Sequence, residues 1–166
     1  MIKTIPHLAD IHIRKQNRYV ENRQVFKTLY KQLKELKPDA IYIGGDVVHG
    51  KLDTSPEEVR MVANFFLELS NIAPTIIIPG NHDCNLNNKS REDTLSPIVD
   101  LVKRITPNLH YWKKSGVYTI EDIDGGIEFG VMSIFDIDKE GNQLTDNLPD
   151  PNTLDADRRI ALFHGG

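Results

Sequence analysis

Short apolar segments alternate with helical segments over the first two-thirds of the chain, and this alternation limits what the chain can fold into. The apolar residues of the longer segments recur at a helical period, while the short segments are rich in β-formers. A β-α-β-α-β-α order implies parallel strands joined by right-handed crossovers. Strands are expected at residues 3–9, 40–43 and 75–78, and helices at residues 21–37, from residue 55 onward, and at residues 95–105.

Two of these helices carry clear boundary signals. Pro38 follows the first helical segment and stops it. The run Ser55-Pro56-Glu57-Glu58 combines a capping box with a proline at the first helical position. The second helix is therefore expected to start at Pro56.

The pattern changes after the third helix. Four further strands are expected, and Asp124-Gly125-Gly126 is a hairpin signal between two of them. Residues 136–157 read as a long acidic loop, a length that is usually functional or mobile. The four strands are expected at residues 109–112, 117–121, 127–135 and 159–163.

Length, cysteine content and charge narrow the class of protein. With 166 residues, the chain is expected to form one domain, residues 1–166. Cys84 has no partner for an internal disulfide, and no window is long and apolar enough to span a membrane, so cytoplasm is the expected location. The net charge of −4 is uneven, because the most basic stretch is residues 14–37 and the most acidic part is residues 121–166.

Polar clusters follow four of the expected strands. Because the carboxyl ends of parallel strands meet at one edge of a sheet, such clusters are typical of active sites in open α/β folds. The tetrapeptide Gly80-Asn81-His82-Asp83 is the most specific of them. The others are Asp10-Ile11-His12, Gly45-Asp46 and Phe163-His164-Gly165.

The residue types in these clusters predict a two-metal phosphoesterase centre. In an extended segment Asp10 and His12 would point the same way and ligate one cation. Asp46, after two glycines, can bridge two cations with its two oxygens, while Asn81 and His164 add an amide oxygen and an imidazole. Such a mixed ligand set without thiolate suits manganese, iron or zinc, and two ions of this kind can activate water and hold a phosphate.

The neighbours of Asn81 are expected to act on the substrate. His82 can protonate the leaving alkoxide, and Asp83 can orient His82 and raise its basicity. His49, three residues after Asp46, is a candidate to line the substrate site, and His164 alone also fits a buried structural histidine. The basic residues before the first helix are candidate contacts to a polyanion, whereas the helical lysines are expected to form a solvated face. These candidate contacts are Arg14, Lys15 and Arg18.

Taken together, the four clusters resemble the first four motifs of calcineurin-like metallophosphoesterases. The segments around Asp10 and around Gly45-Asp46-Val47-Val48-His49 are most similar to the SbcD-type DNA double-strand-break nucleases, including phage types. The resemblance implies a two-sheet sandwich flanked by helices (αββα). It implies two divalent ions, with manganese expected and magnesium, iron or zinc as alternatives. One ion would be held by Asp10, His12 and Asp46, the other by Asp46, Asn81 and His164, with His82 as the catalytic histidine.

Partners are also implied by this resemblance. They are DNA, an SMC-like ATPase of the SbcC type and a second copy of the chain, because the nuclease branch is commonly dimeric. A phage-type protein would work in the host cytoplasm. No membrane partner is expected.

The chain departs from the family's sequence pattern in two places, after Gly-Asp and Asn-His and at the closing motif. Protein phosphatases of the superfamily have an aspartate-arginine-glycine run after Gly-Asp and a glutamate after Asn-His, whereas this chain has His49-Gly50 and Asp83. The Gly-His-x-His motif that closes the family's site does not occur in the 166 residues. We therefore expect a fold incomplete at its C-terminus, the N-terminal portion of a longer protein, and this portion alone to be a weak or inactive enzyme.

Three functions remain open from the sequence. The first is a manganese-dependent exo- or endonuclease subunit of a recombination-repair complex. The second is a metallophosphoesterase acting on nucleotides, small phosphodiesters or RNA ends. The third is a non-catalytic scaffold that keeps the fold without the activity.

Overall fold

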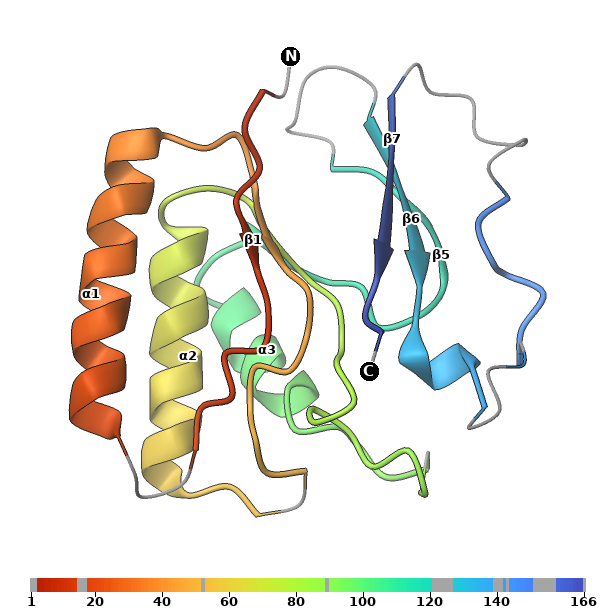
Figure 1. Ribbon diagram of the computed structural model, residues 1–166, viewed down its shortest axis with the longest axis horizontal. Helices are drawn as coiled ribbons and strands as arrows, with labels where there is room; N and C mark the ends of the chain where they lie inside the picture. The colour runs from red at the N-terminus through yellow and green to blue at the C-terminus, as the bar shows by residue number, and fades with distance from the viewer. Residues whose placement is uncertain are drawn as a thin grey trace.

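Two β-sheets lie face to face, and helices cover the outer face of the first (Figure 1). The computed structural model describes residues 3–14, 18–51, 53–88, 90–120, 127–138, 142, 144–150 and 158–165. The hairpin signal at Asp124-Gly125-Gly126, Lys15 and parts of the acidic segment lie outside the described residues.

The first sheet has four strands in the order β1-β2-β3-β4, and all neighbouring pairs are parallel. This arrangement confirms the parallel sheet expected from the β-α alternation. The fourth expected strand also belongs to this sheet, next to β3. The strands are β1 (His7–Leu8), β2 (Ile41–Ile43), β3 (Thr75–Ile77) and β4 (Leu109–Tyr111).

Three helices pack on one face of this sheet, where Figure 1 shows them together at the left. Their inward residues, such as Phe26, Phe65 and Val99, form one apolar cluster with Ile43 and Ile77 of the sheet. Burial of these side chains is the main contribution that fixes the helices on the sheet. The helices are α1 (Tyr19–Leu36), α2 (Pro56–Ser70) and α3 (Ser96–Lys103).

The start of α2 has the predicted capping geometry. The Ser55 hydroxyl accepts a hydrogen bond from the Glu58 backbone nitrogen at 3.2 Å, and the Glu58 carboxylate accepts one from the Ser55 backbone nitrogen at 3.4 Å. The Ser55 hydroxyl also contacts the Tyr19 hydroxyl at 2.9 Å, so it joins the starts of α1 and α2. One small side chain therefore fixes both helix N-termini at the carboxyl edge of the sheet.

The second sheet has three strands, with β5 antiparallel and β7 parallel to the central β6. The expected strand at residues 127–135 ends earlier, because the Ser133 hydroxyl accepts the Phe135 backbone N–H at 3.2 Å and begins a short 3-10 turn, Ile134–Asp136. The strands are β5 (Gly116–Tyr118), β6 (Ile127–Met132) and β7 (Arg158–Phe163).

A second apolar cluster fills the space between the sheets. Tyr42 and Ile76 of the first sheet meet Phe129 and Leu162 of the second, and Trp112 stacks on Tyr118 at 4.9 Å between ring centroids. The α/β class and the paired sheets agree with the expected sandwich. In the described part of the chain the helices lie on the first sheet only, so three of the four expected layers are present.

Among the described residues, no helix has both the length and the apolar character needed to cross a bilayer.

We predict that Ser55→Ala lowers the free energy of unfolding by about 1–2 kcal/mol, because the start of α2 loses its cap. Urea unfolding followed by far-UV circular dichroism measures the change. Thr28→Ala is the control, since Thr28 is an exposed residue within α1 whose hydroxyl bonds only the local Gln24 carbonyl. An equal loss in both variants would contradict a specific role for the cap.

Candidate metal centre

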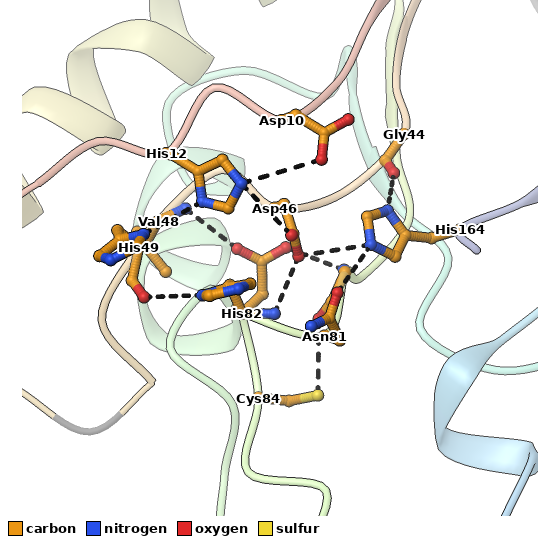
Figure 2. A network of polar contacts seen from close by, with 12 residues as sticks. Asp10, His12, Gly44, Asp46, Val48, His49, Asn81, His82, Cys84 and His164 are labelled. Carbon is orange, nitrogen blue, oxygen red and sulfur yellow. Dashed lines mark hydrogen bonds and ion pairs between the residues drawn. The ribbon is translucent and has the colours of Figure 1, made fainter. Parts of the chain in front are cut away.

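The polar clusters after β1, β2, β3 and β7 converge at one place between the two sheets (Figure 2). Three of the strands belong to the first sheet and the last to the second. The side chains that the structure brings together are Asp10, His12, Asp46, Asn81, His82 and His164. The sequence prediction of one shared site therefore agrees with the geometry.

Asp46 occupies the centre of this arrangement and is only 3% exposed. Its Oδ1 lies 3.5 Å from His164 Nε2, and its Oδ2 lies 3.6 Å from His12 Nε2. The His82 backbone nitrogen donates to Oδ1 at 2.8 Å, which fixes the carboxylate plane. Each oxygen therefore faces a different imidazole, as a carboxylate that bridges two cations would.

His164 is held by a backbone carbonyl. Its Nδ1 donates to the Gly44 oxygen at 2.6 Å, since a carbonyl can only accept. In the neutral ring, Nε2 then presents a lone pair toward Asn81 Oδ1 at 3.0 Å and toward Asp46 Oδ1. Lone pairs from nitrogen and oxygen that converge in this way fit a divalent cation, and the Nδ1 contact is the kind of outer support that metal-binding histidines have.

The backbone conformation that brings Asp10 and His12 to the centre differs from the one expected from the sequence. Their φ angles are 53° and 48°, so the segment is left-handed at both residues and not extended as expected. Asp46 has the same conformation, with φ 53°. Each such residue costs about 1–3 kcal/mol and persists where the surrounding structure imposes it, often at functional sites.

Backbone hydrogen bonds impose this conformation. The Asp10 nitrogen donates to the Gly45 oxygen at 3.2 Å, and the His12 nitrogen donates to the Asp46 oxygen at 3.0 Å. These bonds tie the segment after β1 to the segment after β2. The His12 ring is thereby directed at both carboxylates, with Nε2 3.8 Å from Asp10 Oδ1.

Two glycines allow the loops to approach this closely. A Cβ on Gly45 would lie 2.6 Å from the Gly80 nitrogen and 2.9 Å from His164 Nδ1, and the φ of Gly45 is +91°. A Cβ on Gly80 would overlap the Asp46 nitrogen and Oδ1. The predicted sharp turn before Asp46 is thus present, and Gly80 is its counterpart in the neighbouring loop.

Asp83 has a role different from the one predicted. Its carboxylate is fully buried and accepts hydrogen bonds from the backbone nitrogens of Val48 at 3.1 Å and Gly80 at 2.9 Å. Burial raises the pKa of this carboxyl to about 7, although those two hydrogen bonds lower it. Asp83 therefore joins the loops after β2 and β3, and the expectation that it orients the His82 ring is corrected.

The His82 ring is instead held by His49. The His82 Nδ1 donates to the His49 backbone oxygen at 2.9 Å, and the two rings stack at 5.1 Å between centroids. The His49 Nδ1 also lies 3.4 Å from His12 Nδ1. The structure thus places His49 beside His12 and His82, and its contact with a substrate stays a prediction.

The basic candidates differ in position. Arg14 is exposed. The pKa of His49 is lowered first by desolvation of its ring and then by the positive charge of Arg14. Arg18 is exposed at the start of α1 with φ 64°, and Lys15 is outside the described residues. Of the three basic candidates, Arg14 is the one whose charge acts on a histidine of the candidate centre.

Cys84 is a buried packing residue, as expected. It donates weakly to the Gly80 oxygen at 3.5 Å, and burial raises the pKa of its thiol to about 12. Sequence reasoning missed the Gly44 and His49 carbonyls, because any residue type can supply a backbone oxygen. Only the nearby glycines signal that the backbone comes close to the site.

A family model described as "Calcineurin-like phosphoesterase" matches residues 3–166. The chain belongs to this family. Its members are metallophosphoesterases, so the converging His and Asp side chains are read as a candidate site for divalent ions of unspecified identity. Family membership and a candidate metal site are thus what the match and the geometry show for this chain.

The chain is similar to a curated protein and to a solved structure. It is 43% identical over 172 residues to an uncharacterized protein, R555, of Acanthamoeba polyphaga mimivirus, and the match covers 99% of this chain and 12% of that protein. The chain thus spans about an eighth of the length of the curated relative it matches. It is also similar to the crystal structure of Pseudomonas putida nuclease MPE, with 19% identity, a TM-score of 0.46, and coverage of 75% of this chain and 51% of that one.

We predict that Gly80→Ala destabilises this phosphoesterase domain by more than about 2 kcal/mol and weakens Mn²⁺ binding, because the new Cβ would overlap Asp46. Chemical unfolding and calorimetric Mn²⁺ titration measure the two effects. Gly44→Ala is the matched control, since a Cβ there would meet nothing closer than 3.4 Å. Equal stability of the two variants would contradict the close approach of the loops.

A second prediction concerns Asp83. Asp83→Asn replaces one acceptor oxygen by an amide NH₂, so the Val48 or Gly80 N–H loses its partner in the interior. We expect a loss of about 1–3 kcal/mol in the free energy of unfolding. Unfolding in denaturant measures it, with exposed Asp100→Asn on α3 as the control. If Asp83 acted only on His82, stability would not change.

Proposed function

We propose that this chain is the metal-ion-binding part of a nuclease that hydrolyses phosphodiester bonds in DNA. The observation that carries the proposal is the arrangement of His82. Its Nδ1 is held by the His49 carbonyl, while its ring lies edge-on to His12 at 4.8 Å, at the open side of the candidate centre. The centre therefore has a proton carrier beside its predicted metal ligands.

Five side chains would hold the ions. Asp10, His12 and Asp46 would hold one, and Asp46, Asn81 and His164 the other. Bound divalent ions supply Lewis-acid chemistry, because they offset phosphate charge and lower the pKa of water. Manganese is the proposed ion, since a mixed set of carboxylate, amide and imidazole donors suits it.

The protein's own residues position the substrate and move the proton. In the protonated His82 ring, Nδ1–H stays on the His49 carbonyl while the other N–H can be given to the departing 3′ oxygen. The His82 backbone N–H meanwhile keeps the Asp46 carboxylate in place. His82 thus supplies the proposed general acid with its ring and positions the Asp46 carboxylate with its backbone N–H.

An open site supports a polymeric substrate. The Asp10 side chain is 66% exposed, and His49, on the other side of the His12 ring, is exposed as well. Arg14 next to His49 and Lys51 two residues further along add positive charge at this edge. A centre with exposed residues and basic side chains close by in the chain can receive a nucleic acid backbone, whose phosphates dominate affinity. Arg18, exposed at the start of α1, is a further proposed contact, and Lys15 is proposed from the sequence alone.

The finer parts of the proposal rest on the sequence resemblance. They are a role in recombination repair, work with an SMC-like ATPase of the SbcC type, and pairing with a second copy of the chain. Co-purification with such an ATPase and sedimentation of the protein alone are the measurements that address them.

We predict that His82→Asn lowers the rate of Mn²⁺-dependent cleavage of linear DNA by about 10²- to 10⁴-fold, because the proton donor is lost. Mn²⁺ binding should stay within a few-fold of the wild-type value, since His82 is not among the proposed ligands. The assay uses the purified full-length protein and end-labelled duplex and single-stranded DNA. His110→Asn on β4 is the matched control.

Other outcomes would replace the proposal. If the protein cleaves no DNA but hydrolyses bis(p-nitrophenyl) phosphate, it is a phosphoesterase for small substrates. If calorimetry detects no Mn²⁺ binding to the full-length protein, the scaffold function is the correct one. If His82→Asn keeps full activity, His82 is not the proton donor.

A further inference from the structure

Three imidazoles lie together at the open side of the candidate centre. His12, His49 and His82 each offer one ring nitrogen, and these nitrogens all lie within 4.8 Å of one another. The rings are 4.8–5.3 Å apart between centroids. Figure 2 shows the three rings side by side. Of these three residues, the two-ion site of the proposed function uses only His12 as a ligand.

The donor set of this cluster is chemically distinct from that of the neighbouring one. Asp10, His12 and Asp46 form a second group with two carboxylates, which suits harder ions such as Mn²⁺ or Mg²⁺. Three imidazoles without a carboxylate suit Zn²⁺, which in His₃ sites keeps a fourth position open. The two groups share His12 through different ring nitrogens, Nε2 toward the carboxylates and Nδ1 toward His49. A neutral imidazole has one nitrogen lone pair to offer, so the two groups compete for His12.

The spacing of the first two donors already fits a tetrahedral ion. Two imidazole nitrogens at about 2.0–2.1 Å from zinc, in tetrahedral geometry, are separated by about 3.3 Å. The His12 and His49 Nδ1 atoms are 3.4 Å apart. The third nitrogen requires only a side-chain adjustment of His82, whose ring lies against both of the others.

The backbones that carry the three rings are fixed. The His12 nitrogen donates to the Asp46 oxygen, the His49 nitrogen donates to the Ile13 oxygen at 3.0 Å, and the His82 nitrogen donates to Asp46 Oδ1. The ordering cost of bringing the three side chains together is correspondingly low. The cluster is thus a preorganised set of nitrogen donors facing solvent.

We propose that His12, His49 and His82 form a separate binding site for Zn²⁺ that excludes the ions of the oxygen-rich centre. Zinc bound to His12 Nδ1 would leave the ring proton on Nε2, which faces Asp10 and Asp46, and would also occupy His82. Binding at this site stands independently of the reaction, whereas its consequence, inhibition of phosphodiester cleavage, rests on the proposed function.

Calorimetric titration of the metal-free, full-length protein with ZnCl₂ and, separately, MnCl₂ tests the site. We expect His49→Gln to lower the affinity of one Zn²⁺ site at least tenfold and to change Mn²⁺ affinity less than threefold. Asp10→Asn should do the reverse, weakening Mn²⁺ and sparing that Zn²⁺ site. His110→Gln controls for the loss of a histidine outside the cluster.

Histidine ¹⁵N NMR provides a second readout that does not depend on activity. One equivalent of Zn²⁺ should shift the ring nitrogens of the three clustered histidines and leave His164 unchanged. Unfolding midpoints of the variants confirm that they are folded, and His49→Asn replaces His49→Gln if the latter is not.

Two outcomes decide against the separate zinc site. Unchanged Zn²⁺ affinity in a folded His49 variant, or a His164 shift as large as the others, places zinc in the oxygen-rich centre and overturns the separate site. In the cleavage assay, Zn²⁺ is added to protein saturated with Mn²⁺. It should inhibit DNA cleavage by the wild type at least tenfold more strongly than it inhibits the residual cleavage by His49→Gln. Absence of any DNA cleavage would refute the proposed function while leaving the calorimetric result intact.

Discussion

The buried carboxylate of Asp46 is the interaction on which the arrangement of this site depends. A carboxylate with so little exposure needs compensation, because burial of an unpaired charge is strongly unfavourable. The His82 N–H and the imidazoles of His12 and His164 surround it. Each of these partners comes from a different loop, so satisfying one carboxylate brings the ends of several strands together.

The layers of the fold make that burial possible. The helices cover one face of the first sheet with one apolar cluster, and the second sheet covers the other face with a second cluster. Consecutive residues of the central strands therefore point into different cores, as Ile76 and Ile77 do. Polar side chains find room only where these strands end, and Asp83 uses that position to connect two loops from inside.

The elements of this fold were predictable because their signals are local. The helical period, the Ser55 cap and the apolar strands are read from neighbouring residues. The convergence of Asp10, Asp46 and Asn81 follows from parallel strand ends, whereas His164 comes from a strand of the other sheet. The element ends and the left-handed turns were not predictable, since they depend on hydrogen bonds between distant backbones. The role of the His49 carbonyl and the backbone contacts of Asp83 were not predictable from the sequence for the same reason. The metal ligands and the role of His82 stay predictions.

His164 has a consequence for the stability of the whole sandwich. It follows β7 in the second sheet, whereas Asp46 and Asn81 follow strands of the first. An ion bound by all three would connect the sheets as a cross-link does. Any ligand that binds only the folded form stabilises it in proportion to the logarithm of its concentration. The cohesion of the two sheets would then vary with the supply of metal, and a chelator would loosen their packing as well as empty the site.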